Sequence, residues 1–328
     1  MEFTYQNLHF SENDPEMPYK EDYGIVIAQK KPVIGVGWGQ RKLAIAELYF
    51  LTRYCETQRN IHLLYIGAAP GIHINFLTKI FPTIIFHLYD PKRFFIEPSP
   101  NIIIYPQYFT KDHAEQWRNA QNLIFISDIR RDFREDMTRN EHEQIVIEDM
   151  QKQLEFLRII RPKISFLKFR LPFFEGEMQR EYLEYPEGII FKQPWAPIIS
   201  NETRLVVSQK DVDSVKKYHI KSYRDKLFYH NVYVRNEVKF LNPFTKKTEP
   251  IWYPELLNDF NSLGETLILS ETLKKINYSV NLENVRKLSR TLTIFLNKKK
   301  QYKNWVTISR LRENPFLITE KYETHNKK

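Results

Sequence analysis

Six short runs of aliphatic and aromatic residues alternate with longer polar segments, and this alternation constrains the fold more than any other feature. The runs are IHLLYIG (61–67), TIIFHLYD (83–90), NIIIYP (101–106), NLIFISD (122–128), ISFLKFR (164–170) and RLVVSQ (204–209). Runs that are apolar throughout are typical of strands buried on both faces, as in parallel sheets covered by helices. The sequence therefore predicts an α/β fold with a mostly parallel central sheet flanked by helices.

The segments between and beyond these runs predict further elements. Residues 40–54 and 141–160 carry apolar side chains at helical spacing, so we expect a helix over each. The aromatic-rich stretch over 223–241 predicts one or two edge strands. A last helix is expected over 282–296, where Leu282, Val285, Leu288, Leu292, Phe295 and Leu296 form one apolar stripe.

The chain divides by composition into three regions. We expect an extended N-terminal arm over residues 1–38, a main domain over 39–240 and a C-terminal extension over 241–328. The extension would contain the basic helix and end in a disordered tail, KYETHNKK. The charged side of that helix is either a solvated face or a surface for RNA or a partner protein.

Charge and cysteine content limit the partners and the compartment. The 328 residues carry a net charge of +9, which favours a polyanionic partner such as nucleic acid or an acidic membrane face. No apolar run approaches the roughly 18 residues that span a bilayer, so we expect a soluble, unsecreted protein with no membrane partner. Cys55 is the single cysteine, which excludes an internal disulfide and a paired-cysteine metal clamp. We interpret it as a packing residue.

Two of the nine glycines lie in the turn after the first apolar run. Gly67-Ala68-Ala69-Pro70-Gly71 comes at the carboxyl end of a predicted strand and before a predicted helix, where open α/β sheets bind ligands. The turn lacks the glycine spacing of dinucleotide folds and the lysine of phosphate loops. It resembles the motif of S-adenosylmethionine (SAM)-dependent methyltransferases. A purely structural turn is the alternative.

Asp90 ends the second run, 23 residues after Gly67. In nucleotide-binding folds a carboxylate at this place accepts the ribose hydroxyls of the ligand. An aspartate at a strand end is also a common helix cap. In combination with the glycine turn, Asp90 favours a nucleoside cofactor.

Four charged residues are expected at the same rim. Asp128 ends the fourth run, Lys168 lies in the fifth, Glu202 precedes the sixth and Lys42 lies on the first helix. Because parallel strands end at one sheet edge, Asp128, Lys168 and Glu202 could converge beside a cofactor. The set resembles the Lys-Asp-Lys-Glu tetrad of the FtsJ/RrmJ-like RNA ribose 2′-O-methyltransferases, which have a Rossmann-like fold.

Further segments resemble one branch of that superfamily, the poxvirus-type cap-specific mRNA 2′-O-methyltransferases. They are GQRKLAIAELYFL, YIGAAPGIH, ISDIR, LKFRLPF, QPWAPIISNETRL and YVRN, between Gly39 and Asn236. The resemblance implies transfer of a methyl group from SAM to the ribose 2′-hydroxyl of the first transcribed nucleotide. Lys168 would be the base, with Lys42 lowering its pKa and Asp128 and Glu202 raising it.

For the cofactor, the resemblance implies residues in three groups. The methionine end would be held near Gln40, Tyr65, Gly67, Ala68, Ala69, Pro70, Gly71 and His73. The ribose would be bound by Asp90, with Lys92 or Arg93 nearby, and the adenine would lie between Tyr108 and Phe109. Asp128 would serve both the cofactor and catalysis. His73 could equally be a helix N-terminal residue without a role.

For the RNA cap, the resemblance implies a positively charged guanine stacked between aromatic rings and bound by a carboxylate. Phe173 fits one wall, Tyr19 or Tyr23 the other, and Glu175 the carboxylate. Ile199 replaces a stacking tyrosine of the family, and the second acidic contact falls at Arg224, with Asp225 beside it. Core packing is the alternative for Phe173 and Phe174.

The leading hypothesis is therefore a cap methyltransferase of a large cytoplasmic DNA virus, acting on the 5′ end of capped mRNA. It would work in the cytoplasm of the infected cell, and packaging in the virion is a further expectation. One alternative is a ribosomal or transfer RNA 2′-O-methyltransferase. The other is an RNA-binding processivity subunit of a poly(A) polymerase, since the poxvirus-type protein has that second role.

Overall fold

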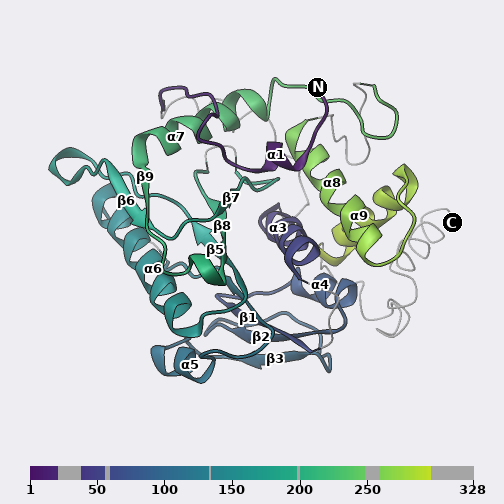
Figure 1. Ribbon diagram of the computed structural model, residues 1–328, viewed down its shortest axis with the longest axis horizontal. Helices are drawn as coiled ribbons and strands as arrows, with labels where there is room; N and C mark the ends of the chain where they lie inside the picture. Colours follow the sequence, from purple (N-terminus) through teal and green to yellow (C-terminus); the bar gives the residue numbers. More distant parts are fainter. Residues whose placement is uncertain (21–37, 56–59, 133, 198–199, 248–258, 297–328) are drawn as a thin grey trace.

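A seven-stranded sheet in the order β3-β2-β1-β4-β5-β8-β7 forms the centre of the computed structural model (Figure 1). The structure describes residues 1–20, 38–55, 60–132, 134–197, 200–247 and 259–296. The strands of the sheet are β1 (Ile61–Ile66), β2 (Ile84–Tyr89), β3 (Ile102–Tyr105), β4 (Leu123–Ser127), β5 (Ile164–Phe169), β7 (Ile189–Phe191) and β8 (Thr203–Ser208). Each of the six apolar runs is a strand, as predicted.

Strand direction reverses between β5 and β8 and again between β8 and β7. The strands β1 to β5 pair in parallel, whereas β8 runs antiparallel to β5, with Lys168 opposite Arg204. The short strand β7 then pairs antiparallel with β8. A separate two-stranded sheet joins β6 (Tyr182–Tyr185) and β9 (Lys216–His219). The α/β fold with a mostly parallel sheet is confirmed.

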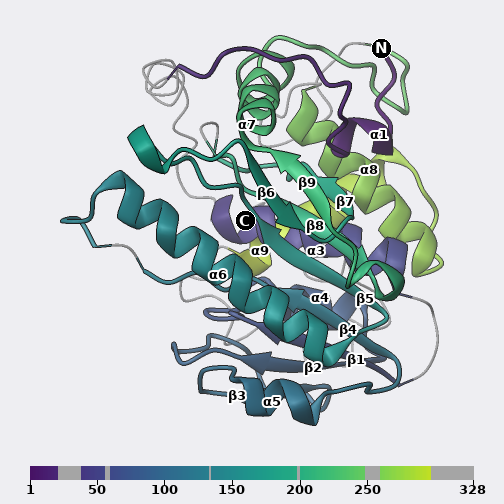
Figure 2. The same cartoon turned by 60° about the vertical axis from the view of Figure 1, so that its left-hand side comes forward.

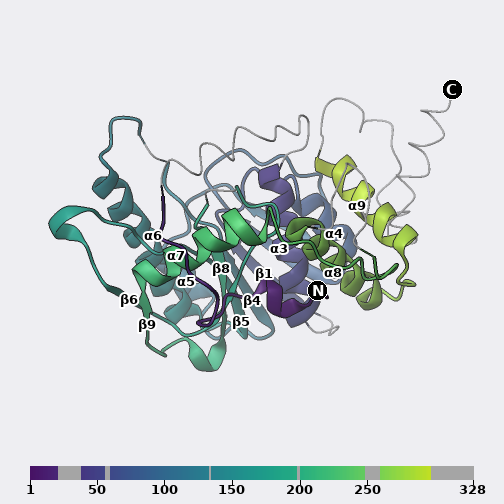
Figure 3. The same cartoon turned by 90° about the horizontal axis from the view of Figure 1, so that it is seen from above.

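Helices cover both faces of the sheet (Figures 2 and 3). One face carries α3 (Trp38–Tyr54), α4 (Ile74–Ile80), α8 (Phe260–Lys275) and α9 (Leu282–Leu296), and the other carries α5 (Lys111–Gln116) and α6 (Arg139–Ile160). Successive side chains of a strand point to opposite faces of the sheet. Leu63 packs in the core beneath the first group of helices, and Leu64 packs in the core beneath the second group. Both side chains are fully buried, which fits a sheet with two cores.

Two helices confirm the sequence prediction and one region contradicts it. Helices α3 and α6 begin two residues before the predicted ranges and end at the predicted residues. The edge strands predicted over 223–241 are wrong. Most of that stretch belongs to α7 (Ile220–Tyr229) and a π-helical segment (His230–Val234). Tyr223, Leu227 and Phe228 are buried at helical spacing, so the aromatic residues follow the period of a helix and not that of a strand.

The N-terminal arm packs against the main domain. It contains a short helix, α1 (Tyr5–Leu8), where the sequence predicted only extended chain. Leu8 is fully buried, and His9 forms a bridge with Phe191. Three acidic side chains of the arm pair with lysines of the main domain: Glu12 with Lys216 at 3.0 Å, Asp14 with Lys192 at 3.0 Å and Glu16 with Lys226 at 3.4 Å.

The C-terminal helix α9 spans the predicted range and buries its apolar stripe. Val285, Leu288 and Leu292 are fully buried in the core that includes α3 and α8. Cys55 is also buried, in keeping with a packing role. Among the helices that the structure describes, none is long and apolar enough to cross a membrane. Lys298 to Lys300 and the tail predicted to be disordered lie outside the described residues.

Candidate active site

The turn after β1 requires glycine at both ends. Gly67 has a φ of +75° and Gly71 a φ of +68°. Residues other than glycine rarely adopt such backbone angles. A β-carbon at Gly67 would lie 2.7 Å from the backbone carbonyl carbon of Asp128, and one at Gly71 would lie 2.5 Å from Ile96 Cδ1. Gly67 therefore lets the end of β1 pass unusually close to the end of β4.

A cavity of about 770 Å³ opens at the carboxyl ends of β1, β2 and β4. We call it the turn cavity. Its walls come from Ile66, Gly67, Ala69, Tyr89, Asp90, Pro91, Lys92, Tyr108, Phe109, Asp128, Ile129, Arg130, Arg131, Asp132, Glu148, Asp149, Lys152 and Phe156. Strand order reverses between β1 and β4, and open α/β sheets bind ligands at such a switch point.

Asp90 faces the turn cavity and also holds its rim. One carboxylate oxygen accepts a hydrogen bond from the Ala69 backbone N–H at 3.1 Å. The other accepts from the Lys92 backbone N–H at 2.8 Å. Each carboxylate oxygen can accept a second bond, so capacity remains for a ligand hydroxyl.

The residues predicted to bind a cofactor fall into two groups. Gly67, Ala69, Asp90, Lys92, Tyr108, Phe109 and Asp128 line the turn cavity. Gln40, Tyr65, Ala68, Pro70, Gly71, His73 and Arg93 do not line it. Lys92 also forms an exposed ion pair with Asp132 at 2.7 Å.

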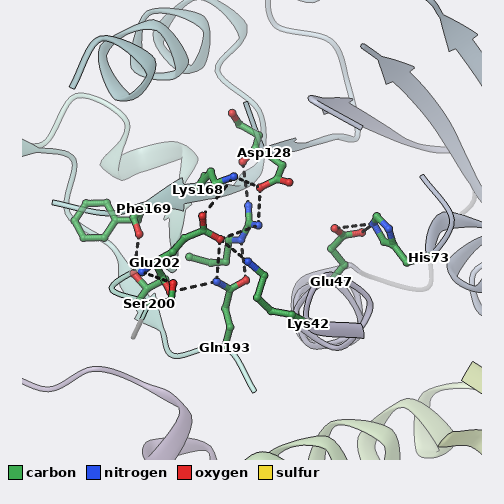
Figure 4. Close-up of polar contacts among 12 residues, drawn as sticks. Lys42, Glu47, His73, Asp128, Lys168, Phe169, Gln193, Ser200 and Glu202 are labelled. Atoms are coloured by element: carbon green, nitrogen blue, oxygen red, sulfur yellow. Dashed lines mark hydrogen bonds and ion pairs between the residues drawn. The ribbon is translucent and has the colours of Figure 1, made fainter. Parts of the chain in front are cut away.

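Tyr65 and His73 are instead joined through Glu47 on α3. The Tyr65 hydroxyl donates to Glu47 Oε1 at 2.7 Å, and His73 Nε2 lies 3.1 Å from the same carboxylate. His73 Nδ1 lies 2.8 Å from Gln40 Oε1. Burial and the charge of Glu47 raise the pKa of Tyr65 well above its usual range. Glu47 and His73 lie apart from the other side chains labelled in Figure 4. The contacts of Glu47 connect α3 to β1 and to the turn.

Lys42, Asp128, Lys168 and Glu202 meet in one cluster (Figure 4). Lys168 Nζ lies 3.1 Å from Asp128 Oδ1 and 3.4 Å from Glu202 Oε2. Lys42 Nζ lies 2.7 Å from Glu202 Oε1. All four side chains are mostly buried, with exposed fractions between 12% and 16%. We call these four residues the tetrad.

The reversed strand β8 explains the position of Glu202. Lys168 lies in β5 one residue before its end, whereas Glu202 directly precedes the start of β8. Because β8 runs antiparallel to β5, its beginning lies beside the carboxyl end of β5. Glu202 therefore joins the other residues from the start of an antiparallel strand, and not from the end of a parallel strand as the sequence predicted.

Arg204 is a fifth charged member of this region. Its guanidinium donates to Asp128 Oδ1 at 2.6 Å and to Gln193 Oε1 at 3.0 Å. Gln193 in turn donates to the backbone oxygen of Glu202 at 3.3 Å. Arg204 is only 2% exposed, so it is a buried support beneath the tetrad.

The positive charges keep both tetrad carboxylates ionised. Burial alone would raise the pKa of Asp128, but the charges of Arg204 and Lys168 outweigh it and hold the pKa below its usual range. Burial opposes ionisation of Glu202 in the same way, and Lys168 and Lys42 hold its pKa well below the usual range. The site therefore presents two fixed anions among three cationic side chains.

A second cavity, of about 660 Å³, is rich in arginine. We call it the arginine cleft. It is lined by Tyr19, Arg134, Met137, Thr138, Arg139, His142, Glu143, Arg170, Phe173, Ser200, Asn201 and Arg224. Asn201 precedes Glu202 directly and Arg170 follows Lys168 by two positions, so the cleft adjoins the tetrad. Its charge is suited to an anionic chain such as RNA.

The residues predicted to bind a cap are placed differently from one another. Tyr19 and Phe173 both line the arginine cleft, and Phe173 is 5% exposed. Glu175 is exposed and pairs with Arg139 at 2.5 Å. Asp225 is buried, and one of its oxygens accepts from the Tyr19 backbone N–H at 3.1 Å. Tyr23 and Ile199 lie outside the described residues.

Several residues of these cavities were not predicted. Arg130, Arg131 and Asp149 line the turn cavity, with Arg131 Nε 2.9 Å from Asp149 Oδ1. Arg130 is the last residue of the ISDIR segment and Arg131 follows it directly, so their place beside Asp128 was a usable signal. Arg204 and Glu47 also lie in segments that resemble the family, but no spacing or element end singled them out, because each lies within an ordinary strand or helix pattern. Within the described ranges, no three His, Cys, Asp or Glu side chains gather where they could hold a metal ion.

Comparisons with known proteins match the chain to one family and to several named relatives. A family model described as "Poly A polymerase regulatory subunit" matches residues 4–299. The chain belongs to this family. Its relatives include the cap-specific mRNA (nucleoside-2′-O-)-methyltransferase of fowlpox virus (strain NVSL), which is 30% identical over 220 residues, 62% of this chain and 69% of the relative.

Two further relatives carry the same name. They come from the Lausanne and Uriarra strains of myxoma virus, and each is 26% identical over 251 residues, 70% of either chain. The predicted resemblance to poxvirus cap methyltransferases is confirmed.

Proposed function

We propose that this protein is a SAM-dependent methyltransferase that modifies the ribose 2′-hydroxyl of the first transcribed nucleotide of capped mRNA. The observation that carries the proposal is the position of the tetrad. Asp128 belongs both to the tetrad and to the turn cavity, while Asn201, next to Glu202, belongs to the arginine cleft. A methyl donor in one cavity and an RNA in the other would therefore meet at Lys168.

The turn cavity fits a nucleoside-containing methyl donor. Its volume of about 770 Å³ lies in the range of small-molecule sites. Asp90 offers oxygens for ribose hydroxyls, and the rings of Tyr108 and Phe109 offer an apolar wall for a base. Gly67 leaves open the space where a side chain would collide with Asp128. When bound, SAM supplies an electrophilic methyl group.

Lys168 is the proposed base for the 2′-hydroxyl. With Lys168 neutral, the charges of Lys42 and Arg204 balance those of Asp128 and Glu202, so the cluster can lose one proton without leaving an unbalanced charge. The carboxylates fix the amine in position, since Lys168 Nζ contacts both at 3.1 and 3.4 Å. Low exposure keeps water from competing for the proton.

The arginine cleft is the proposed path of the RNA. Tyr19 and Phe173 offer aromatic surfaces for the methylated guanine, as stacking on aromatic rings suits a cationic base. Arg134, Arg139 and Arg170 offer charges for the phosphates. Binding through such contacts would weaken steeply as salt concentration rises.

A second role as a partner subunit of a poly(A) polymerase is favoured by the description of the family model. The two roles need not exclude each other, because the proposed methyl transfer uses only the two cavities and the tetrad. The poxvirus relatives support action in the cytoplasm of an infected cell. A ribosomal or transfer RNA substrate remains the alternative within the enzyme class.

The test is methyl transfer from labelled SAM to three RNAs: capped, uncapped and structured. Wild type should label capped RNA, and Lys168→Ala should not. The matched control is Lys217→Ala, which removes an exposed lysine paired with Glu184 at 3.8 Å. Equal labelling of capped and uncapped RNA would eliminate the cap-dependent reading. If none of the three RNAs is labelled, the candidate that is left is a role as a partner subunit of a poly(A) polymerase.

A further inference from the structure

Arg224 contacts both aromatic rings of the arginine cleft. Its guanidinium carbon lies 5.1 Å from the centre of the Tyr19 ring and 5.3 Å from the centre of the Phe173 ring. A cation within about 6 Å of a ring centre is attracted by the ring's electrons. The place where the two rings could hold a cationic ligand is therefore already occupied by a cation of the protein itself.

The two rings are held more firmly than the arginine. Tyr19 is fixed through its backbone N–H to Asp225, and its ring meets Phe228 edge to face at 5.2 Å. Phe173 donates its backbone N–H to Glu143 at 3.0 Å, and Arg170 pairs with that carboxylate at 2.6 Å. The rings thus form fixed walls.

Arg224 has weaker polar contacts. Its side chain is 27% exposed, and its nearest carboxylate in the described part of the chain, that of Asp225, lies 3.8 Å from Nε. Arg224 Nε is buried and has no hydrogen-bond partner among the described residues. A buried donor without an acceptor favours a conformation in which it finds one. The guanidinium is therefore the movable part of this arrangement.

We propose that Arg224 is a displaceable plug of the slot between Tyr19 and Phe173, and that it becomes a phosphate ligand when it leaves. The inference rests on the proposed function, which supplies a cationic guanine linked to phosphates. The Arg170 guanidinium carbon also lies 5.4 Å from the centre of the Phe173 ring, but among the described cation–ring contacts only Arg224 meets both Phe173 and Tyr19. A guanine that stacks between these two rings therefore enters by expelling the Arg224 guanidinium. The expelled side chain remains in the cleft, where the ligand's phosphates give Nε an acceptor.

The plug has opposite consequences for two ligands. The nucleoside 7-methylguanosine must displace Arg224 and has no phosphate for the displaced side chain to bind. In 7-methylguanosine triphosphate, the phosphates offer new contacts to that side chain. Arg224 therefore makes recognition of the methylated base conditional on the attached phosphates, and it acts as a specificity-determining residue.

The test compares the dissociation constants of these two ligands, measured by tyrosine fluorescence or calorimetry, in wild type, Arg224→Ala and Arg224→Gln. Both variants should bind the nucleoside about fivefold more tightly than wild type does. The ratio of nucleoside to triphosphate dissociation constants should fall by about tenfold. Unchanged or weaker nucleoside binding in both variants would overturn the proposal.

Two further variants test whether tighter nucleoside binding results from removing Arg224 from between the two rings. Arg180→Ala removes an exposed cation that lies 5.4 Å from the ring centre of Phe174, next to Phe173, and lines neither cavity, so nucleoside binding should not change. Equal tightening by Arg180→Ala would mean general charge repulsion and would refute a plug. Phe173→Ala should abolish the gain in an Arg224→Ala background, and a retained gain would also refute it. Methyl transfer to capped RNA by wild type tests the proposed function separately, so failure of either claim is recognisable.

Discussion

Arg204 reaches across the neighbouring strand β5 to donate a hydrogen bond to Asp128 at 2.6 Å. The two residues are attached to β8 and to the end of β4, on either side of β5 in the sheet. Lys168 of β5 stands opposite Arg204 in register and contacts the same carboxylate oxygen. Arg204 therefore fixes the anion against which the proposed base is held.

Replacing Arg204 by alanine should destabilise the protein by about 3–5 kcal/mol, because it leaves a buried carboxylate without its main partner. Urea unfolding at neutral pH measures the effect. Arg118→Ala is the control: Arg118 pairs with Glu115 at 2.6 Å on the surface and should contribute at most about 1 kcal/mol. Similar losses in the two variants would contradict a supporting role for Arg204.

Gly67→Ala should weaken SAM binding by at least about tenfold and lower stability by roughly 1–3 kcal/mol, because the residue has a positive φ and no room for a β-carbon. Equilibrium dialysis with labelled SAM and thermal unfolding measure the two effects. Gly39→Ala, where nothing lies within 4 Å of the added carbon, should keep full SAM affinity. The interpretation of the turn fails if the Gly67 variant binds SAM normally.

Asp225→Ala should raise KM for capped RNA several-fold and leave kcat unchanged, because it frees the backbone of Tyr19 without touching the tetrad. Steady-state kinetics with varied RNA separate the two constants. Asp213→Ala, which removes an exposed carboxylate paired with Arg161, is the comparison. An unchanged KM would show that Asp225 does not position Tyr19 for the substrate.

The buried His87 should make the protein less stable in mild acid. Burial, assisted by the neighbouring His62, lowers the pKa of His87 to about 4, from about 6.5 in the unfolded chain. Between these values the unfolded chain binds the proton and the native protein does not, so stability falls as pH drops from 6.5 towards 4.

Urea unfolding at pH 7.5, 6 and 5 measures this contribution. In His87→Gln, part of the loss of stability on acidification should disappear, while the variant is less stable than wild type at pH 7.5 because it loses the contact with His62 at 2.9 Å. Parallel pH profiles for the two proteins would exclude His87 as the source.

The sheet could be predicted from the sequence because a buried strand is apolar throughout, and each of the six runs is one. Its reversed strand could not, since β8 has the same apolar pattern as its parallel neighbours. The segment after His219 was misassigned because alternating aromatic residues suggest strands. In the structure, Tyr223 and Leu227 lie one turn apart on the buried face of α7.

The candidate site, like the sheet, could be predicted only in part. The tetrad could be found because each member stands near the end of a predicted element and the set resembles a known pattern. Arg204 could not, because an arginine inside a strand gives no indication that it lies under a carboxylate. The cofactor prediction for His73 depended on its place in the turn, yet the side chain points to Glu47, a contact that only the packing of α3 determines.

The most direct test of the central claim is the position of the transferred methyl group. Capped RNA is incubated with labelled SAM and wild type or Lys168→Ala, then digested to nucleosides. We predict label on the ribose of the first transcribed nucleotide, and a rate about 10²- to 10⁴-fold lower in the variant, which should still bind SAM. Label on a base, or equal rates for the two proteins, would contradict the account.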